Sequence, residues 1–176
     1  MKYNYESFWE IRGETPAEPF DETKKLLIRR ILKDIDYRNV LEFGCGNGEL
    51  SQLIKEKECH LTGVDISEDR LQMNTDLDAK LLQDVTQESF YPVSDLIICS
   101  HFLLHIKPDD LKKVIQIMLK YSTKHIIFIE PNPEAKLGVW EYYNFQHNYD
   151  EILKEMNLKH DKIYFSPVVC CWIITK

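Results

Sequence analysis

Short apolar runs alternate with segments of helical spacing along most of this chain of 176 residues. In the segment 20–35, for example, Leu27, Ile28, Ile31 and Leu32 recur at the three- and four-residue intervals of one helix face. The expected strands are 39–43, 59–64, 80–83, 95–99 and 125–129, and the expected helices are 20–35, 46–57 and three that start at Ser67, Pro108 and Asn148. Strands that alternate with helices predict a parallel sheet with helices on both faces.

Two more strand-like runs, 162–165 and 168–174, close the sequence on either side of Ser166-Pro167 and predict a hairpin. We therefore expect an α/β fold, a doubly wound, mostly parallel seven-stranded sheet with a C-terminal antiparallel hairpin. It would form a single domain over 1–176, with a lead-in and a helix in 1–36. The final strand, 168–174, would be able to pair between subunits if it were exposed, although the oligomeric state stays unknown.

The net charge of the chain and its N-terminal sequence restrict the classes of function that we expect. The formal net charge is −7, and an acidic chain repels phosphate backbones, so we expect no nucleic-acid partner. The N-terminus lacks the pattern of a signal peptide, and no apolar run is long enough to cross a membrane. We expect a cytoplasmic protein that has no membrane partner.

Cysteine spacing gives no sign of a metal site. The five cysteines are Cys45, Cys59, Cys99, Cys170 and Cys171. No pair has the two-residue gap typical of zinc or redox sites, and none clusters with histidine at ligand spacing. We expect buried, reduced thiols and no bound metal.

A glycine-rich junction is the strongest sign of a binding site. Gly44, Gly46 and Gly48 are three of only six glycines, and they join a strand to a helix. Glycine there permits a tight turn and lets a ligand approach the backbone at the start of the helix. Glu42 lies two residues before the first glycine, where a buried carboxylate needs hydrogen-bond donors or a positive charge, such as the ammonium of an amino-acid ligand.

This segment resembles the first motif of class I S-adenosylmethionine-dependent methyltransferases, which reads acid-x-Gly-x-Gly-x-Gly. The resemblance covers about residue 38 to the C-terminus, and it implies a Rossmann-like fold and S-adenosylmethionine as cofactor. It also implies that the loop wraps the methionine part of the cofactor. The residues expected to bind it are Glu42, Gly44, Cys45, Gly46 and Gly48.

Three later segments are similar to further motifs of that family. In 61–67, Asp65 ends the second strand and is the expected ribose ligand, with Ile66 beside it. In 82–84, Asp84 is expected to accept from the adenine amino group, with the backbone of Val85 or Gln83 in support. The segment 94–106 resembles the fourth strand and its loop, and it adds Ser100 to the expected cofactor-binding residues.

The segment 8–13 resembles a lead-in of some small methyltransferases. Arg12 would pair with the cofactor carboxylate, since a guanidinium can bind it through two hydrogen bonds. Tyr5 and Trp9 would cover the cofactor. An ordinary surface arginine and a packed tryptophan are the alternative.

The acceptor would lie over the ends of the fourth and fifth strands. Methyl transfer is a displacement, so the protein mainly aligns the acceptor and takes up a proton. The candidates for that base are His101 and His147, because histidine titrates near neutrality; a structural role is the alternative for each, and the expected one for His105. Glu130, Trp140, Tyr142 and Tyr143 also lie in this region of the sequence.

Several functions remain open. The first is a methyltransferase acting on a small-molecule acceptor; the others are a non-catalytic S-adenosylmethionine-binding partner and a protein methyltransferase. The glycine spacing argues against a nicotinamide-dependent oxidoreductase. Methyltransferases of nucleic-acid amino groups carry Asn/Asp-Pro-Pro-Tyr/Phe after the fourth strand, where this chain has Cys-Ser-His-Phe at 99–102. The sequence does not identify the acceptor.

Overall fold

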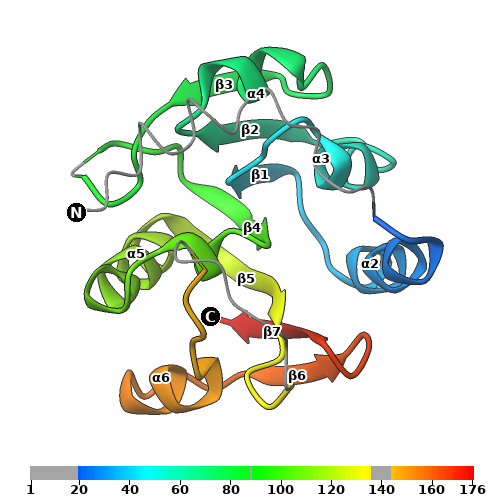
Figure 1. Ribbon diagram of the computed structural model, residues 1–176. Helices are drawn as coiled ribbons and strands as arrows, with labels where there is room; N and C mark the ends of the chain where they lie inside the picture. The colour runs from blue at the N-terminus through cyan, green and yellow to red at the C-terminus, as the bar shows by residue number, and fades with distance from the viewer. Residues whose placement is uncertain (1–19, 88, 136–143) are drawn as a thin grey trace.

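The computed structural model describes residues 20–87, 89–135 and 144–176 (Figure 1). They form one α/β domain built on a seven-stranded sheet, as the sequence predicts. The strands are β1 (Asn39–Phe43), β2 (His60–Asp65), β3 (Ala79–Leu82), β4 (Ser94–Ser100), β5 (Ser122–Pro131), β6 (Asp161–Tyr164) and β7 (Val169–Thr175).

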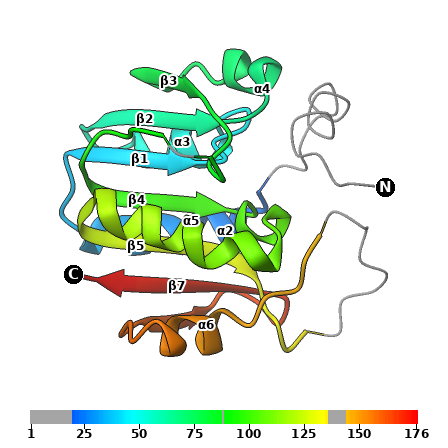
Figure 2. The same cartoon turned by 90° about the vertical axis from the view of Figure 1, so that its left-hand side faces the viewer.

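The strand order is β3-β2-β1-β4-β5-β7-β6. Neighbours from β3 to β5 pair in parallel, whereas β7 pairs antiparallel to both β5 and β6. Figure 2 shows β7 running against the other strands. The order reverses between β1 and β4, and open parallel sheets bind ligands at such a switch point.

The helices lie on both faces of the sheet (Figure 1). They are α2 (Glu22–Asp34), α3 (Glu49–Ile54), α4 (Glu68–Met73), the 3-10 turn η1 (Leu103–His105), α5 (Pro108–Tyr121) and α6 (Tyr149–Glu155). Side chains cap three of these helices, as Asp21, Ser67 and Asn148 each accept a hydrogen bond from a first-turn N–H.

Alternate residues of the central strands enter two separate cores. Ile126 and Phe128 of β5 belong to the core that includes residues of α5 and α6. Ile127 and Ile129 belong to the core on the other face, which includes residues of α2 and α3. A strand buried on both faces reads as a continuous apolar run, which is why the sequence reveals β5 so clearly.

Two expectations need correction. The helix expected at 46–57 begins only at Glu49, because the glycine loop occupies the preceding residues. The last strand is also not exposed: β7 lies between β5 and β6, so its two backbone edges are paired within the chain. Pairing of this strand between subunits is therefore excluded, and the short strands β3 and β6 form the sheet edges.

All five cysteines are free. Within the described ranges, no group of three or more His, Cys, Asp or Glu side chains is placed to hold a metal ion. In those same ranges, no helix combines the length and the apolar character needed to cross a membrane.

Candidate functional site

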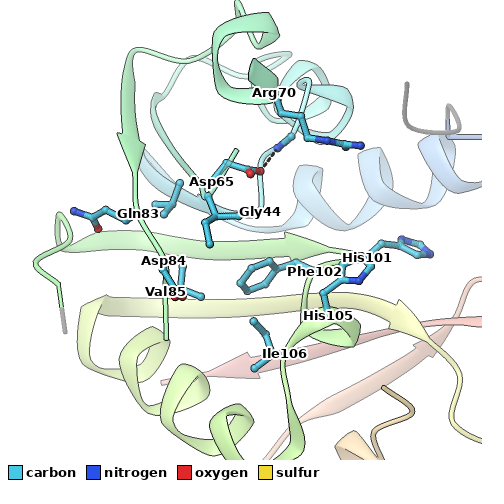
Figure 3. A pocket seen from close by; sticks show the side chains of 13 residues that line it. Gly44, Asp65, Arg70, Gln83, Asp84, Val85, His101, Phe102, His105 and Ile106 are labelled. Atoms are coloured by element: carbon cyan, nitrogen blue, oxygen red, sulfur yellow. Dashed lines mark hydrogen bonds between the residues drawn. The ribbon is translucent and has the colours of Figure 1, made fainter. Parts of the chain in front are cut away.

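A cavity lies where the sheet order reverses, at the carboxyl ends of β1, β2 and β4 (Figure 3). Its walls come from the glycine loop, the end of β2, α4, the segment after β3 and the loop after β4. The lining residues are Gly44, Gly46, Val64, Asp65, Ile66, Arg70, Gln83, Asp84, Val85, His101, Phe102, His105 and Ile106.

The glycine loop forms the wall that follows β1. Gly44, Gly46 and Gly48 have φ angles of +65°, +50° and +101°. Residues other than glycine rarely adopt these values, so each of the three glycines is required by the backbone itself. The Gly44 N–H donates to the carbonyl of Val64 over 2.8 Å, which ties the loop to β2.

A buried polar chain supports this loop from behind. Ser51 donates from Oγ to Oε2 of Glu42 over 2.6 Å, and Asn74 donates from Nδ2 to Ser51 Oγ over 2.8 Å. A Cβ on Gly48 would meet Oδ1 of Asn74 at 2.6 Å, so the chain fits closely against the loop. Burial raises the pKa of Glu42 to about 8, although the hydrogen bond from Ser51 acts to lower it.

Asp65 presents a fixed carboxylate to the cavity. Its Oδ2 accepts from the Gly46 N–H over 2.8 Å (Figure 3), and its Oδ1 accepts from the Ser67 N–H over 2.9 Å. Burial raises the pKa of Asp65, while these two backbone donors favour the ionised form. A carboxylate oxygen can accept more than one hydrogen bond, so each oxygen keeps the capacity to bind a ligand hydroxyl.

Asp84 and Val85 line the cavity beyond the end of β3. Oδ1 of Asp84 accepts from both the N–H and the Oγ1 hydroxyl of Thr86, over 2.8 Å and 2.7 Å. These two bonds fix the orientation of the carboxylate. The described residues between Asp84 and β4 form only turns and irregular structure, as expected from the short spacing.

Glu130, at the end of β5, organises the loop that follows β4. This fully buried carboxylate accepts hydrogen bonds from three successive backbone N–H groups, those of Phe102 (2.9 Å), Leu103 (2.9 Å) and Leu104 (3.3 Å). Burial raises the pKa of Glu130 to about 7, although the three donors stabilise its ionised form. Glu130 therefore shapes the cavity wall through the loop backbone and is not itself a lining residue.

His101 has an unusual backbone conformation at the cavity rim. Its φ is +51°, in the left-handed region that non-glycine residues seldom adopt, and its N–H donates to the carbonyl of Ile129 over 2.9 Å. Strained residues of this kind concentrate at functional sites. Lys24, on α2, reaches the same side chain, with its Nζ 3.0 Å from Nδ1 of His101.

Eight residues that the sequence predicts to contact cofactor or acceptor line this cavity. They are Gly44, Gly46, Asp65, Ile66, Gln83, Asp84, Val85 and His101. Four others lie beside or behind the wall: Glu42 and Cys45 are buried, Gly48 precedes α3, and Ser100 places Oγ 3.2 Å from Nδ1 of His101. Arg12, Tyr5, Trp9, Trp140, Tyr142 and Tyr143 lie outside the described residues.

The contacts of His147 do not favour the role of a base. The side chain is buried, and its Nε2 lies 3.1 Å from the carbonyl of Leu103 and 2.9 Å from that of Ile106. A nitrogen between two carbonyl oxygens is a donor, so this histidine holds the turn η1 in place. His147 is not among the residues that line the cavity.

Sequence reasoning missed part of the wall. Arg70 of α4 lines the cavity, with Nη1 3.8 Å from the position that a Cβ on Gly46 would take. Its place five residues after Asp65 gave no separate signal. Phe102 and Ile106 belong to the motif-like segment after β4, but from the sequence an apolar residue there can equally be interpreted as part of the hydrophobic core. His105, expected to be structural, also lines the cavity.

The fold and the cavity define a Rossmann-like α/β domain with a cavity at the carboxyl ends of the strands of a parallel sheet. A family model described as a methyltransferase domain matches residues 14–160. The chain therefore belongs to this methyltransferase domain family. A search of curated protein sequences finds no match.

Solved structures with the same fold cover almost the whole chain. N-methyltransferase NodS from Bradyrhizobium japonicum WM9, in complex with S-adenosyl-L-homocysteine, has a TM-score of 0.77 at 14% identity, covering 98% of this chain and 99% of NodS. A DhpI-SAM-HEP complex has a TM-score of 0.75 at 13% identity, over 96% and 94%. Magnesium protoporphyrin IX methyltransferase from Synechocystis PCC 6803, with bound SAM, has a TM-score of 0.65 at 15% identity, over 98% and 92%.

Proposed function

We propose that this protein binds S-adenosylmethionine in the cavity at the sheet switch point and transfers its methyl group to a small-molecule acceptor. One observation carries the proposal: the carboxylate of Asp65 and the glycine loop meet at a single hydrogen bond of 2.8 Å, facing one cavity. The hydrogen bond places a carboxylate that can accept from ligand hydroxyls beside the backbone of Gly44 and Gly46, which a ligand can approach because glycine has no side chain. The similar structures support the choice, since they contain bound SAM or S-adenosyl-L-homocysteine.

The described residues fit the proposed cofactor. Gly44 and Gly46 leave the backbone open, Asp65 can accept from a ribose diol, and Asp84 can accept from an adenine amino group. The apolar side chains that line the same cavity, Val64, Ile66 and Val85, suit the flat faces of a purine. When bound, S-adenosylmethionine supplies the methyl group as an electrophile.

The loop after β4 is the part of the wall that we assign to the acceptor. His101, Phe102, His105 and Ile106 line the cavity there, and Glu130 fixes the backbone that carries them. Alignment of the acceptor is the main contribution that a displacement reaction needs from the protein. His101 is the residue we propose to handle the acceptor proton.

One of the similar structures is a magnesium protoporphyrin IX methyltransferase, and this favours a small-molecule acceptor over a protein acceptor. A non-catalytic cofactor-binding partner and a protein methyltransferase stay as alternatives. The cytoplasmic location expected from the sequence stays a prediction.

Calorimetric titration tests the proposal. S-adenosylmethionine and S-adenosylhomocysteine should bind to the wild-type protein, NAD should not, and Asp65→Ala should weaken binding at least tenfold because a charged hydrogen-bonding partner is lost. Asp69→Ala is the matched control, since Asp69 is exposed in the first turn of α4. Binding of NAD alone, or equal binding to both variants, would overturn the assignment.

A further inference from the structure

The side chains of Lys24 and His101 form a pair that joins α2 to the loop after β4. The two residues are 77 positions apart, yet Nζ of Lys24 lies 3.0 Å from Nδ1 of His101. Nζ also lies 3.6 Å from the centre of the Phe20 ring, a cation–π distance that helps to hold the ammonium in place. On the histidine side, the bond to Ile129 holds the left-handed backbone, and Oγ of Ser100 lies 3.2 Å from the same Nδ1.

The chemistry of this contact determines where the imidazole carries its proton. A lysine ammonium is a donor only, so Nδ1 must accept the hydrogen bond. A second positive charge on the ring, 3.0 Å away, would be strongly repelled, and the ring is therefore neutral. A neutral ring that accepts at Nδ1 carries its proton at Nε2, and in this state Nε2 cannot remove a proton from an acceptor.

We propose that Lys24 is a positioning residue that decides whether His101 donates a hydrogen bond to the ligand or takes a proton from it. While Lys24 is charged, His101 presents Nε2–H. Once Lys24 is neutral, the ring can donate from Nδ1 to Nζ, and Nε2 is free to accept. This inference rests on the proposed function only in naming the methyl acceptor as the source of the proton.

The proton transfer balances without any further reactant. The X–H bond of the acceptor breaks, its proton moves to Nε2 of His101, and the Nδ1 proton passes to Nζ of Lys24, which becomes an ammonium. The electron pair of the broken X–H bond stays on the acceptor atom X and forms the new bond to the methyl group. The bond between that methyl group and the sulfonium sulfur of S-adenosylmethionine would break at the same time, and its electron pair would stay on sulfur, leaving S-adenosylhomocysteine. His101 would be the catalytic residue, and Lys24 would act through it.

The surroundings of Lys24 bring its proton loss close to neutral pH. Burial lowers the pKa of Lys24 to about 8, although the charges of three carboxylates act in the opposite direction: Glu130 on β5, Glu49 on α3 and Asp21 at the cap of its own helix. Desolvation lowers the pKa of His101 as well, and the charges of Lys24 and His105 add to the effect. Both shifts agree with a lysine that loses its proton while the neighbouring ring stays neutral.

Nuclear magnetic resonance of the histidine ring nitrogens tests the pairing without any turnover. In the wild-type protein at pH 7, His101 should be the Nε2–H tautomer. In Lys24→Met both tautomers should be populated, and the pKa of His101 should rise by about one unit because a neighbouring cation is gone. Lys25→Met is the control, since Lys25 pairs with Glu22 on the same helix. An unchanged tautomer and pKa in Lys24→Met would overturn the inference.

Arginine at position 24 separates positioning from simple packing. Lys24→Arg keeps a donor that never loses its charge, so it should retain the Nε2–H tautomer at every pH. Turnover of the wild-type protein should rise between pH 7 and 9 with little change in cofactor KM, and in Lys24→Arg this rise should be absent. A rise of equal size in the arginine variant would overturn the transfer to Lys24. Absence of turnover with every acceptor would count against the proposed function alone, because the tautomer measurement needs no acceptor.

Discussion

Gly44 and Phe102 are in such close contact that a Cβ atom on the glycine would lie 2.5 Å from Cδ2 of the ring. The ring also packs against Phe43, with its centroid 6.2 Å away. The glycine loop and the loop after β4 therefore meet directly at the cavity, and each limits the position of the other. The part of the wall assigned to the cofactor and the part assigned to the acceptor share this contact.

Alanine substitutions at two glycines separate backbone strain from this contact. Gly44 and Gly46 both have positive φ, +65° and +50°, so alanine costs roughly 1–2 kcal/mol at either position. At Gly46 the nearest atom to the added Cβ is 3.8 Å away, whereas at Gly44 the ring must move. We expect Gly44→Ala to lose about 1–3 kcal/mol more in free energy of unfolding, measured with urea. Equal losses in the two variants would show that the contact is relieved without cost.

Asp84 should set the preference for adenine. Because Thr86 donates to Oδ1 twice, we expect Oδ2 to accept from the exocyclic amino group of the base. The wild-type protein should bind S-adenosylhomocysteine at least tenfold more tightly than S-inosylhomocysteine, which has an oxygen in place of that amino group. In Asp84→Ala the two affinities, measured by calorimetry, should become similar. Asp109→Ala, in the first turn of α5, is the control; a preference that survives in Asp84→Ala would show that another group selects the base.

The buried carboxyl of Glu42 should make the protein less stable as pH rises. Its pKa is raised from 4.5 to about 8 in the folded state, so between these values the folded state binds more protons than the unfolded state. Stability therefore falls through this window, by at most about 1.4 kcal/mol per pH unit for one group. Glu130, with its pKa raised to about 7, acts in the same direction.

Glu42→Gln isolates the contribution of Glu42, since glutamine has nearly the same shape and keeps an oxygen to accept from Ser51. Urea unfolding at pH 5, 6.5 and 8 should give a smaller loss of stability in the variant than in the wild type. If the two proteins lose stability in parallel, Glu42 is already ionised at pH 5 and the predicted effect of burial is wrong.

Asp150 should be a main stabilising residue of the C-terminal part. Its carboxylate accepts from Nε1 of Trp172 (2.9 Å) and from Nζ of Lys162 (2.8 Å), and Nε2 of His160 lies 3.1 Å away. Asp150→Ala should lower the free energy of unfolding by about 1–3 kcal/mol, because the buried Nε1 of Trp172 loses its acceptor while the two partly exposed partners can turn to water. Chemical unfolding followed by tryptophan fluorescence measures the loss. Asp161→Ala, an exposed change on β6, should have little effect, and similar losses in both would contradict the assignment.

The sequence predicts the strands and the acids at their ends because both depend on local pattern. An apolar run that ends in a carboxylate, such as the one before Asp65, places that group at the carboxyl edge of a parallel sheet whatever the loops do. The glycines at 44, 46 and 48 likewise act through their own backbone. These residues could be predicted without knowing which distant segments touch.

The remaining features depend on contacts between distant segments. Lys24 meets His101 across 77 residues, and nothing in helical spacing indicates which lysine of the helix will reach the site. Glu130 follows a buried strand just as Asp65 does, yet its carboxylate turns to three backbone N–H groups of a neighbouring loop. The position of β7 between β5 and β6 also depends on which strands pair most favourably. The alternation of apolar and polar residues along a strand does not encode this choice.

The antiparallel direction of β7 has a practical consequence for the experiments above. Thr175 pairs with His125, near the start of β5, and the Lys176 N–H donates to the carbonyl of Lys124, so Lys176 lies at the end of the strands opposite the cavity (Figure 2). A tag or surface anchor joined after Lys176 would leave the cavity facing the solution. Immobilised protein should therefore bind the cofactor as the free protein does, and libraries of candidate acceptors can be screened on a chip.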